Sequence, residues 1–273
     1  MSVYADAAER FRGLHAVGRT LVLPNAWDAA SARLVEGAGA AAIATTSSGV
    51  AWANGYPDGD VIPPRVLVDA VTRIVRVVAI PVSVDAEGGY AEDPTRVAET
   101  VRALIDVGVV GVNLEDGSRA PDVLCAKVTA VREAAVRSGI DLFVNARTDV
   151  FLRGLVPPER RVAETLARAA RYRDAGCDGL FVPAASDPED IAALVAGTEL
   201  PVNVMVMPGL PPIATLAALG VRRVSAGAAI AQAVHGLTRR LAARLLADGG
   251  DAGLFEGAVP YAELNGLFAA TGS

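Results

Sequence analysis

The chain has 273 residues, of which 52% are hydrophobic and 21% are charged, so a sizeable core is available and an extended disordered chain is excluded. Its net charge of −6 and its pI of about 5.1 argue against nucleic-acid binding, which requires a basic surface. The first residues carry charge rather than an apolar signal core, and no apolar run approaches the length of a membrane span, so we expect a protein without membrane association.

The first part of the chain predicts helices that alternate with apolar strands. Residues 4–17 are spaced as an amphipathic helix, and residues 21–25 form the first expected strand. Asp28 is a suitable N-cap for an alanine-rich helix at 29–37. A second strand at 41–46 leads into a polar stretch, followed by a long loop and a helix that begins at two prolines. The polar stretch is Ser47, Ser48 and Gly49, and the loop runs to about residue 62. The helix begins at Pro63 and Pro64 and runs to about residue 78.

Three successive strands in the middle of the chain end in charged side chains. The strand that begins at 81 ends in Asp85 and Glu87, which share one face because residues two apart in an extended chain do so. The next strand, 109–115, ends in Glu115, and the strand at 142–147 ends in Arg147. Neighbouring strands lie about 4.8 Å apart, so adjacent parallel strands would bring these four side chains onto one patch.

Such a patch carries more acid than one arginine offsets. Two unit charges 4 Å apart repel by roughly 4 kcal/mol at an effective dielectric constant of 20, and three carboxylates repel several times as strongly. A divalent cation removes this repulsion, and a site built only from oxygen ligands favours Mg²⁺ or Mn²⁺. The alternative interpretation is a set of solvated acidic loops without a ligand.

The rest of the chain repeats the strand and helix alternation. Helices are expected at about 94–107, 121–138, 158–175, from 188, from 212, at 228–247 and at 260–270, and strands at 179–183, 201–206 and 221–227. Eight strands that alternate with helices over this length predict a (β/α)₈ barrel of the TIM type, a single domain over 1–273 with residues 228–273 as a C-terminal helical extension. A doubly wound sheet is the competitor, but its glycine fingerprint is missing after the first strand.

The distribution of polar residues favours an enzyme over a packing scaffold. Polar side chains gather at the carboxyl ends of the expected strands, where TIM barrels carry their active sites, and Asn203 belongs to this set. The strand interiors read as nearly all apolar. Cys125 and Cys177 lie far apart in sequence, which indicates no disulfide framework and agrees with a cytoplasmic location.

The order of these motifs resembles the isocitrate lyase/phosphoenolpyruvate mutase superfamily over about residues 20–230. The matching segments are Thr46 to Gly49, Tyr56 to Asp58, Asp85 to Tyr90, Asn113 to Asp116 and Asn145 to Asp149. The resemblance implies a barrel that forms homotetramers in which the C-terminal helical region, here 228–270, is exchanged with a neighbouring subunit.

The resemblance also implies a role for each site residue. Asp85 looks like the direct Mg²⁺ ligand, with Glu87 and Glu115 holding the ion through waters and Asp58 assisting from the opposite wall. Ser48 and Gly49, with Ser47 beside them, look like the residues that bind a substrate carboxylate. Arg147 looks like the residue that neutralises the substrate and the developing enolate, and Asn203 is a further candidate for substrate contact. As catalytic residues we therefore expect Arg147, Glu115 and Ser48.

The chain departs from the superfamily pattern after Glu115. The lyases carry a Lys-Arg-Cys-Gly-His loop there, and the mutases a lysine and an asparagine, whereas this chain has only the short segment 116–122, with Ser118 and Arg119. The expected activity is Mg²⁺-dependent cleavage of a carbon–carbon bond next to an α-oxo or 2-hydroxy (di)carboxylate, through a pyruvate-type enolate. The alternatives are a phosphonopyruvate or oxaloacetate hydrolase, a phosphoenolpyruvate phosphonomutase (an isomerase), and a metal-dependent oxo-acid binding protein that has lost catalysis.

Overall fold

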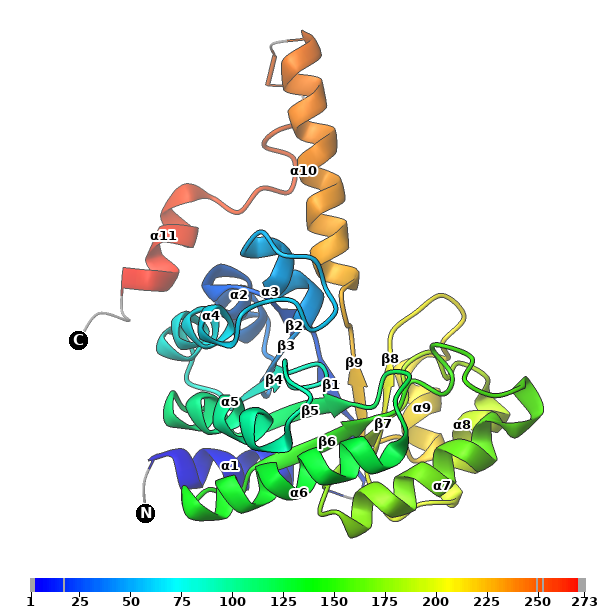
Figure 1. Cartoon of the computed structure of the whole chain (residues 1–273). Coiled ribbons are helices and arrows are strands. Elements are labelled where there is room, and N and C mark those ends of the chain that lie inside the picture. Colours follow the sequence, from blue (N-terminus) through cyan, green and yellow to red (C-terminus); the bar gives the residue numbers. More distant parts are fainter. Residues whose placement is uncertain (1–2, 17, 249, 252, 270–273) are drawn as a thin grey trace.

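The computed structural model describes residues 3–16, 18–248, 250–251 and 253–269, and shows a parallel barrel surrounded by helices (Figure 1). The sheet has the strand order β1-β9-β8-β7-β6-β5-β4-β3-β2, and every pair is parallel. The strands are β1 (Leu21–Leu23), β2 (Asn25–Ala26), β3 (Ile43–Thr45), β4 (Val82–Asp85), β5 (Gly111–Glu115), β6 (Phe143–Arg147), β7 (Gly179–Phe181), β8 (Val202–Met205) and β9 (Arg223–Ser225).

The two ends of this strand order are consecutive in the chain, and this closes the barrel. β1 pairs with β9 and β2 pairs with β3, while only Pro24 separates β1 from β2. Proline has no N–H for the ladder, so the first expected strand is interrupted at that residue and changes partner there. The predicted (β/α)₈ barrel is therefore confirmed, and two short strands, β1 and β2, occupy the position of its first strand.

The helices follow the predicted order with two differences. Helix α1 (Val3–Gly13) ends before the expected residue 17, which lies outside the described residues. Residues 47–53 form a helix, α3 (Ser47–Ala53), where a loop was expected, so that prediction was wrong. The others are α2 (Ala29–Gly37), α4 (Pro64–Val77), α5 (Pro94–Asp106), α6 (Pro121–Arg137), the 3₁₀ turn η1 (Pro158–Arg160), α7 (Arg161–Asp174), α8 (Pro188–Ala196), α9 (Ile213–Leu219), α10 (Ala229–Asp248) and α11 (Tyr261–Ala269).

Local sequence signals fix where several of these helices begin. Asp28 caps α2 by accepting from the Ser31 N–H, and the Ser31 hydroxyl completes a capping box. Asp93 and Asp187 accept N–H groups in the first turns of α5 and α8, and each is followed by proline at the first helical position. These caps place the start of each helix, and therefore the length of each loop above the barrel mouth.

The interior of the barrel is polar, contrary to the apolar strands expected from the sequence. Asn113, Asn145 and Asn203 lie within their strands, Arg223 is the first residue of β9, and each is 5% exposed or less. The Asn145 amide donates to Asn113 Oδ1 at 3.0 Å and to Asn203 Oδ1 at 3.1 Å, and Arg223 Nη2 approaches Asn113 Oδ1 at 3.3 Å. Pairing of these amides across the barrel axis makes their burial tolerable.

The parallel register places the charged strand ends side by side. Asp85 of β4 is aligned with Asn113 of β5, and Glu115 of β5 is aligned with Arg147 of β6. Asp85, Glu115 and Arg147 are the last residues of these three adjacent strands, and Glu87 lies two residues beyond the end of β4. The barrel thus brings together the acidic patch that the sequence predicted.

The C-terminal helices lie outside the barrel. Figure 1 shows α10 extending away from the barrel mouth, after which the chain turns back and places α11 on the side of α2. There Arg33 Nε of α2 donates to Leu267 O of α11 at 3.1 Å. Within the described ranges, no helix combines the length and apolar character needed to cross a membrane. Cys125 and Cys177 are both free thiols.

Candidate active site

A cavity of about 650 Å³ opens at the carboxyl ends of the strands. Its lining combines side chains from nearly the whole circumference of the barrel, with Asn25 on β2, Ser47 and Ser48 on α3, Asp85 on β4, and Arg147 on β6. Asp58 and Asn113 also line it. The cavity therefore lies where the acidic strand ends meet the first turn of α3.

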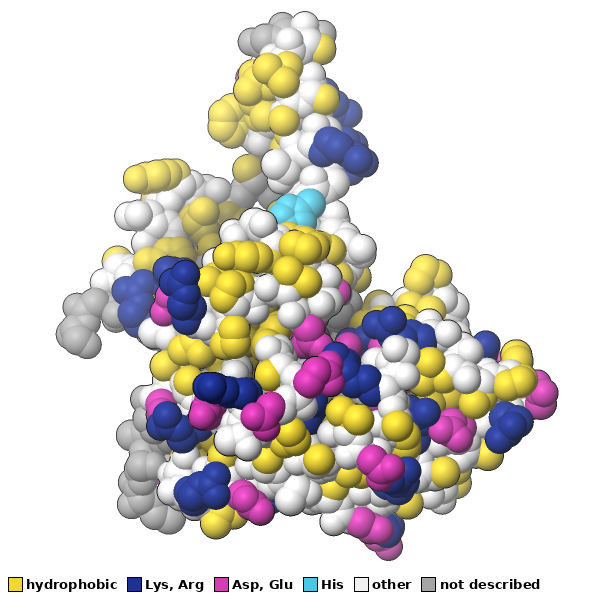
Figure 2. All heavy atoms as spheres, viewed as in Figure 1, with side chains coloured by type: hydrophobic (Ala, Val, Ile, Leu, Met, Phe, Trp, Pro, Cys, Tyr) yellow, Lys and Arg dark blue, Asp and Glu magenta, His cyan; other side chains and the backbone are white. Residues whose placement is uncertain are grey.

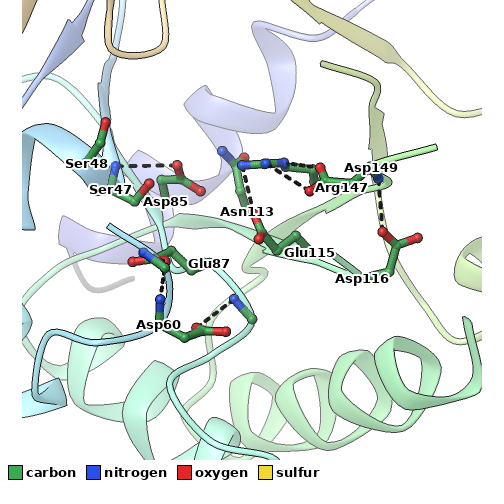
Figure 3. A network of polar contacts seen from close by, with 12 residues as sticks. Ser47, Ser48, Asp60, Asp85, Glu87, Asn113, Glu115, Asp116, Arg147 and Asp149 are labelled. Carbon is green, nitrogen blue, oxygen red and sulfur yellow. Dashed lines mark hydrogen bonds and ion pairs between the residues drawn. The ribbon is translucent and has the colours of Figure 1, made fainter. Parts of the chain in front are cut away.

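Asp85 stands at the end of β4 and faces the serines of α3. Its Oδ2 accepts the Ser47 N–H at 3.4 Å, and its own N–H donates to Thr45 Oγ1 at 2.9 Å (Figure 3). Its Oδ1 is buried and has no hydrogen-bond partner among the described residues. One oxygen of Asp85 is thus positioned by the protein and the other is left for a ligand.

Glu87 lies in a tight turn that is held from two sides. Its backbone has φ +47°, a left-handed conformation that is uncommon for a residue with a side chain. Its Oε2 accepts the N–H groups of Gly59, at 2.9 Å, and of Asp60. In return, Asp60 Oδ1 accepts the N–H groups of Gly88 at 2.9 Å and Tyr90 at 3.1 Å. The two loops brace each other and fix the Glu87 carboxylate, whose Oε1 has no hydrogen-bond partner in the part of the chain that the structure describes.

Glu115 and Arg147 form the opposite side of the acidic cluster. Arg147 Nη1 lies 2.7 Å from Glu115 Oε2 as an ion pair, and Arg147 Nε donates to Asp149 Oδ1 at 2.7 Å (Figure 3). The guanidinium carbon also lies 5.8 Å from the ring centre of Phe181. Two carboxylates and an aromatic ring therefore hold this cation at the cavity wall.

Asp116 stabilises the loop that carries Asp149, the residue that binds Arg147. It is buried, and its carboxylate accepts the Asp149 N–H at 2.9 Å, Arg168 Nη1 at 2.8 Å and the Tyr172 hydroxyl at 2.6 Å. Its two oxygens are therefore satisfied by protein groups. Asp116 acts as a brace for the loop that carries Asp149, and through it for Arg147.

Three carboxyl groups at the site, those of Glu115, Glu87 and Asp58, have raised pKa values because they are buried. Burial raises the pKa of Glu115 to about 8, against the opposing effect of Arg147, and it raises the pKa of Glu87 to about 7, against the Asp60 N–H. Burial also raises the pKa of Asp58, and the nearby Asp85 carboxylate adds to that rise. For Arg147, burial alone would lower the pKa, but Glu115, Asp149 and Asp85 outweigh it and raise the pKa. The site thus holds more negative charge than its own cation compensates.

The residues of the cluster fit a hard divalent cation bound largely through water. Within the described residues, no three His, Cys, Asp or Glu side chains lie close enough to hold a metal by themselves. However, among the residues that the structure describes, Asp85 Oδ1 and Glu87 Oε1 are buried without a hydrogen-bond partner, and Glu115 Oε2 has only its ion pair with Arg147. Mg²⁺ takes oxygen ligands, keeps several waters and needs only one or two protein carboxylates. An all-oxygen donor set with unsatisfied buried atoms matches that demand.

The remaining residues expected at the site fall into two groups. Ser47 and Ser48 line the cavity, and Ser48 Oγ lies 3.2 Å from Thr46 Oγ1. Gly49 does not line it; a side chain at Gly49 would lie 2.8 Å from the Trp27 Cβ, so close packing against Trp27 explains the glycine. Asn203 lies below the cavity floor, 1% exposed, and its amide donates to Val204 O at 2.7 Å.

Sequence reasoning missed two residues that shape the site. Asp60 lies in an unremarkable polar loop, and only the fold shows that it braces the Glu87 turn. Lys127 is buried on α6, and its Nζ donates to Gly88 O at 2.7 Å, which fixes the same turn. Lys127 is the sole lysine of the chain, and that rarity was the one signal that could have singled it out.

Comparisons with known proteins agree with this geometry. Residues 11–246 match the family model described as phosphoenolpyruvate phosphomutase. A solved structure from Burkholderia cenocepacia J2315, provisionally named a lyase/mutase, is 37% identical with a TM-score of 0.89, and the match covers 98% of this chain and 97% of the other.

Two further matches are to proteins of named activity. An oxaloacetate decarboxylase of Pseudomonas fluorescens (strain SBW25) is 32% identical over 63% of this chain and 61% of its own length. The structure of a phosphonopyruvate hydrolase in complex with oxalate and Mg²⁺ has a TM-score of 0.83 at 23% identity, covering 96% of this chain and 94% of the other, which shows a shared fold.

Proposed function

The chain belongs to the phosphoenolpyruvate phosphomutase family, a family of lyases and mutases, and from that premise we propose that it is a Mg²⁺-dependent carbon–carbon lyase. Its substrate is an α-oxo or 2-hydroxy acid, and the reaction passes through a pyruvate-type enolate. The observation that carries this proposal is the cavity lined by Asp85, Arg147, Ser47 and Ser48. Behind its lining, Glu115 forms an ion pair with Arg147, and Glu87 has a buried carboxylate oxygen without a hydrogen-bond partner among the described residues.

The protein groups supply binding and charge stabilisation. Ser47 and Ser48 offer hydroxyl groups to the substrate carboxylate at the polar wall of the cavity. Arg147 is fixed by Glu115 and Asp149, so it does not need to reorganise when negative charge develops on the substrate. Preorganised positive charge of this kind stabilises the oxygen of the enolate more than the uncharged carbonyl oxygen of the ground state, and it therefore lowers the barrier.

Asp85 would hold the cation directly, with Glu87 and Glu115 holding its waters and Asp58 assisting from the facing loop. When bound, Mg²⁺ acts as a Lewis acid on the oxo and carboxylate oxygens of the substrate. The buried, unpartnered oxygens of Asp85 and Glu87 support this assignment. Mn²⁺ has similar ligand preferences and is expected to substitute.

Pyruvate release from a substrate panel tests the proposal. Oxaloacetate, phosphonopyruvate and alkylmalates are incubated with the protein in Mg²⁺ and, separately, in excess chelator, and pyruvate is measured with a coupled dehydrogenase. Metal-dependent release of pyruvate from oxaloacetate or an alkylmalate, which requires cleavage of a carbon–carbon bond, supports the lyase. Release from phosphonopyruvate alone would instead support the hydrolase, and formation of phosphoenolpyruvate from it would support the mutase.

A binding protein without catalysis is the second candidate, and one observation favours it. Segment 116–122 holds no Cys, His or Lys that could protonate a leaving group, and its Arg119 is engaged by Glu92, with Nε–Oε1 at 3.0 Å. Tight Mg²⁺-dependent oxalate binding with no turnover of any panel member would support this candidate and exclude the lyase.

We also propose a homotetramer that exchanges its C-terminal helices. Figure 2 shows apolar side chains gathered on the projecting helix α10. Ile230, Val234 and Leu237 are 37%, 42% and 42% exposed, and their spacing places them on one face of the helix. Light scattering during gel filtration should give a tetramer, and Leu237→Glu should shift it toward smaller species. A monomeric wild type would exclude the exchange.

A cytoplasmic location is part of the same proposal. The two free thiols, Cys125 and Cys177, suit a reducing compartment. Fractionation of the source cells should recover the protein with the cytoplasmic marker. Recovery in the membrane or external fraction would exclude this location.

A further inference from the structure

Arg223 is a fully buried cation without a carboxylate partner among the described residues. It is the first residue of β9 and is 1% exposed, and its Nη2 donates to Asn113 Oδ1 at 3.3 Å. Its Nε and Nη1 have no hydrogen-bond partner in the same part of the chain. Arg147 and Arg168, by contrast, form ion pairs with buried acids. Because a charge buried without an ion pair destabilises the folded state, packing alone does not explain Arg223.

The Asn113 amide links this guanidinium to the cavity. Asn113 lines the cavity, and its Oδ1 accepts from Arg223 at 3.3 Å and from the Asn145 amide at 3.0 Å. In the sheet register Asn113 is aligned with Asp85, the residue expected to hold the cation directly. Arg223 therefore lies beneath the cavity floor, one side chain away from the cavity.

The opposite end of the barrel offers Arg223 no compensating charge. Arg223 is aligned there with Leu21, which belongs with Phe11 of α1 to a buried apolar cluster. Burial and the charge of Arg223 lower the pKa of His15 to about 3, so this imidazole is neutral at physiological pH. Burial lowers the pKa of Arg223 itself to about 10, and the charge of Asp85 opposes that fall. The guanidinium is therefore protonated at neutral pH, and the acid that its charge acts on is Asp85.

We propose that Arg223 is a positioning residue of the active site, which acts through Asn113 and supplies a fixed positive charge beneath the cavity floor. This inference rests on the proposed function and deepens it, because it adds a second cation to Arg147 for the negative charge of the substrate and its enolate. A buried positive charge opposes binding of the free metal ion and favours binding of an anion beside the metal, since the barrel interior screens both interactions weakly. Natural proteins commonly keep destabilising groups of this kind where function requires them.

Removal of this charge should move two affinities in opposite directions. Arg223→Met keeps an unbranched apolar stem and loses the guanidinium. Calorimetry measures the binding of Mg²⁺ alone, and then the binding of oxalate, a dianion, in saturating Mg²⁺. We expect Mg²⁺ to bind about threefold more tightly and oxalate about fivefold more weakly, while the Tm without ligands rises. A merely structural role for Arg223 predicts instead a lower Tm and the loss of both affinities.

Three further variants separate the charge from the hydrogen bond. Arg223→Lys keeps the charge and should retain both wild-type affinities. Arg223→Gln keeps an N–H donor for Asn113 without the charge, and should show the same opposite changes as Arg223→Met. Arg222→Met is the matched control, because it removes the same charge from the adjacent, partly exposed side chain, and it should leave both affinities unchanged.

Oxalate binding by the wild type distinguishes failure of this inference from failure of the proposed function. If the wild type binds oxalate in Mg²⁺, but Arg223→Met and Arg223→Gln leave both affinities unchanged or weaken both, the inference is overturned and the proposed function stands. If the wild type does not bind oxalate in Mg²⁺, the proposed function is overturned, and this inference with it.

Discussion

Glu115 gives a direct test of the electrostatics of the acidic cluster. Burial raises its pKa from 4.5 to about 8, so between these values the folded protein holds a proton that the unfolded chain has released. The native state therefore binds more protons than the unfolded state, and stability without metal falls as pH rises through this window. Each pKa unit corresponds to about 1.4 kcal/mol, which makes the loss from Glu115 at most about 5 kcal/mol.

The measurement is thermal unfolding between pH 5.5 and 8.5 in excess chelator. About 3 kcal/mol of this loss falls between pH 5.5 and pH 8.5. For a chain of this size, 1 kcal/mol corresponds to about 2 °C in Tm, so Tm should fall by about 6 °C. Glu115→Gln cannot ionise and should lose this component of the pH dependence. Glu133→Gln is the matched control, because Glu133 is 64% exposed and lies 3.7 Å from Arg137 in a surface ion pair. It should behave as the wild type does.

Magnesium should counteract the loss. A ligand that binds only the folded state adds about 2.7 kcal/mol at a hundred times its Kd, and binding is strongest when the carboxylates are ionised. The rise in Tm on adding Mg²⁺ should therefore be larger at pH 8.5 than at pH 5.5. A wild-type Tm that does not fall relative to that of Glu115→Gln across this range would refute the reasoning.

Three further predictions concern single side chains. Asp85→Ala should reduce metal-dependent turnover at least a hundredfold and remove the stabilisation by Mg²⁺, while circular dichroism stays native; activity retained in saturating Mg²⁺ would remove Asp85 from its assigned role. Asp116→Ala leaves the buried Arg168 without one of its partners and should lower the free energy of unfolding by about 3–5 kcal/mol, measured by urea titration, and a loss below 1 kcal/mol would contradict the bracing role. Lys127→Met keeps the apolar stem of the side chain but loses the hydrogen bond to Gly88 O. The affinity for Mg²⁺, measured by calorimetry, should therefore fall about tenfold with little change in Tm. Unchanged affinity would show that the Glu87 turn is held without Lys127.

The sequence by itself determined the architecture and the acidic core of the site. Short continuous apolar runs, proline and aspartate at helix starts, and acids at strand ends are local signals, and each is set by steric and hydrogen-bonding rules within a few residues. Asp85, Glu115 and Arg147 could be placed at one end of a parallel barrel because a strand's direction fixes which end its last residue occupies. The register then brought Glu115 and Arg147 side by side, as expected.

Only the tertiary structure decided which groups support those residues and how deep in the barrel each candidate residue lies. Asp60 and Lys127 reach the Glu87 turn from loops and helices distant in sequence, and no local pattern encodes that meeting. Asn203 belongs to the same barrel as the other candidates, but it is the second residue of β8 and lies below the floor of the cavity, where the Asn145 amide donates to its Oδ1. Side-chain alternation fixes a face of the strand, whereas the depth of a residue and its partners depend on how all the strands close around one axis.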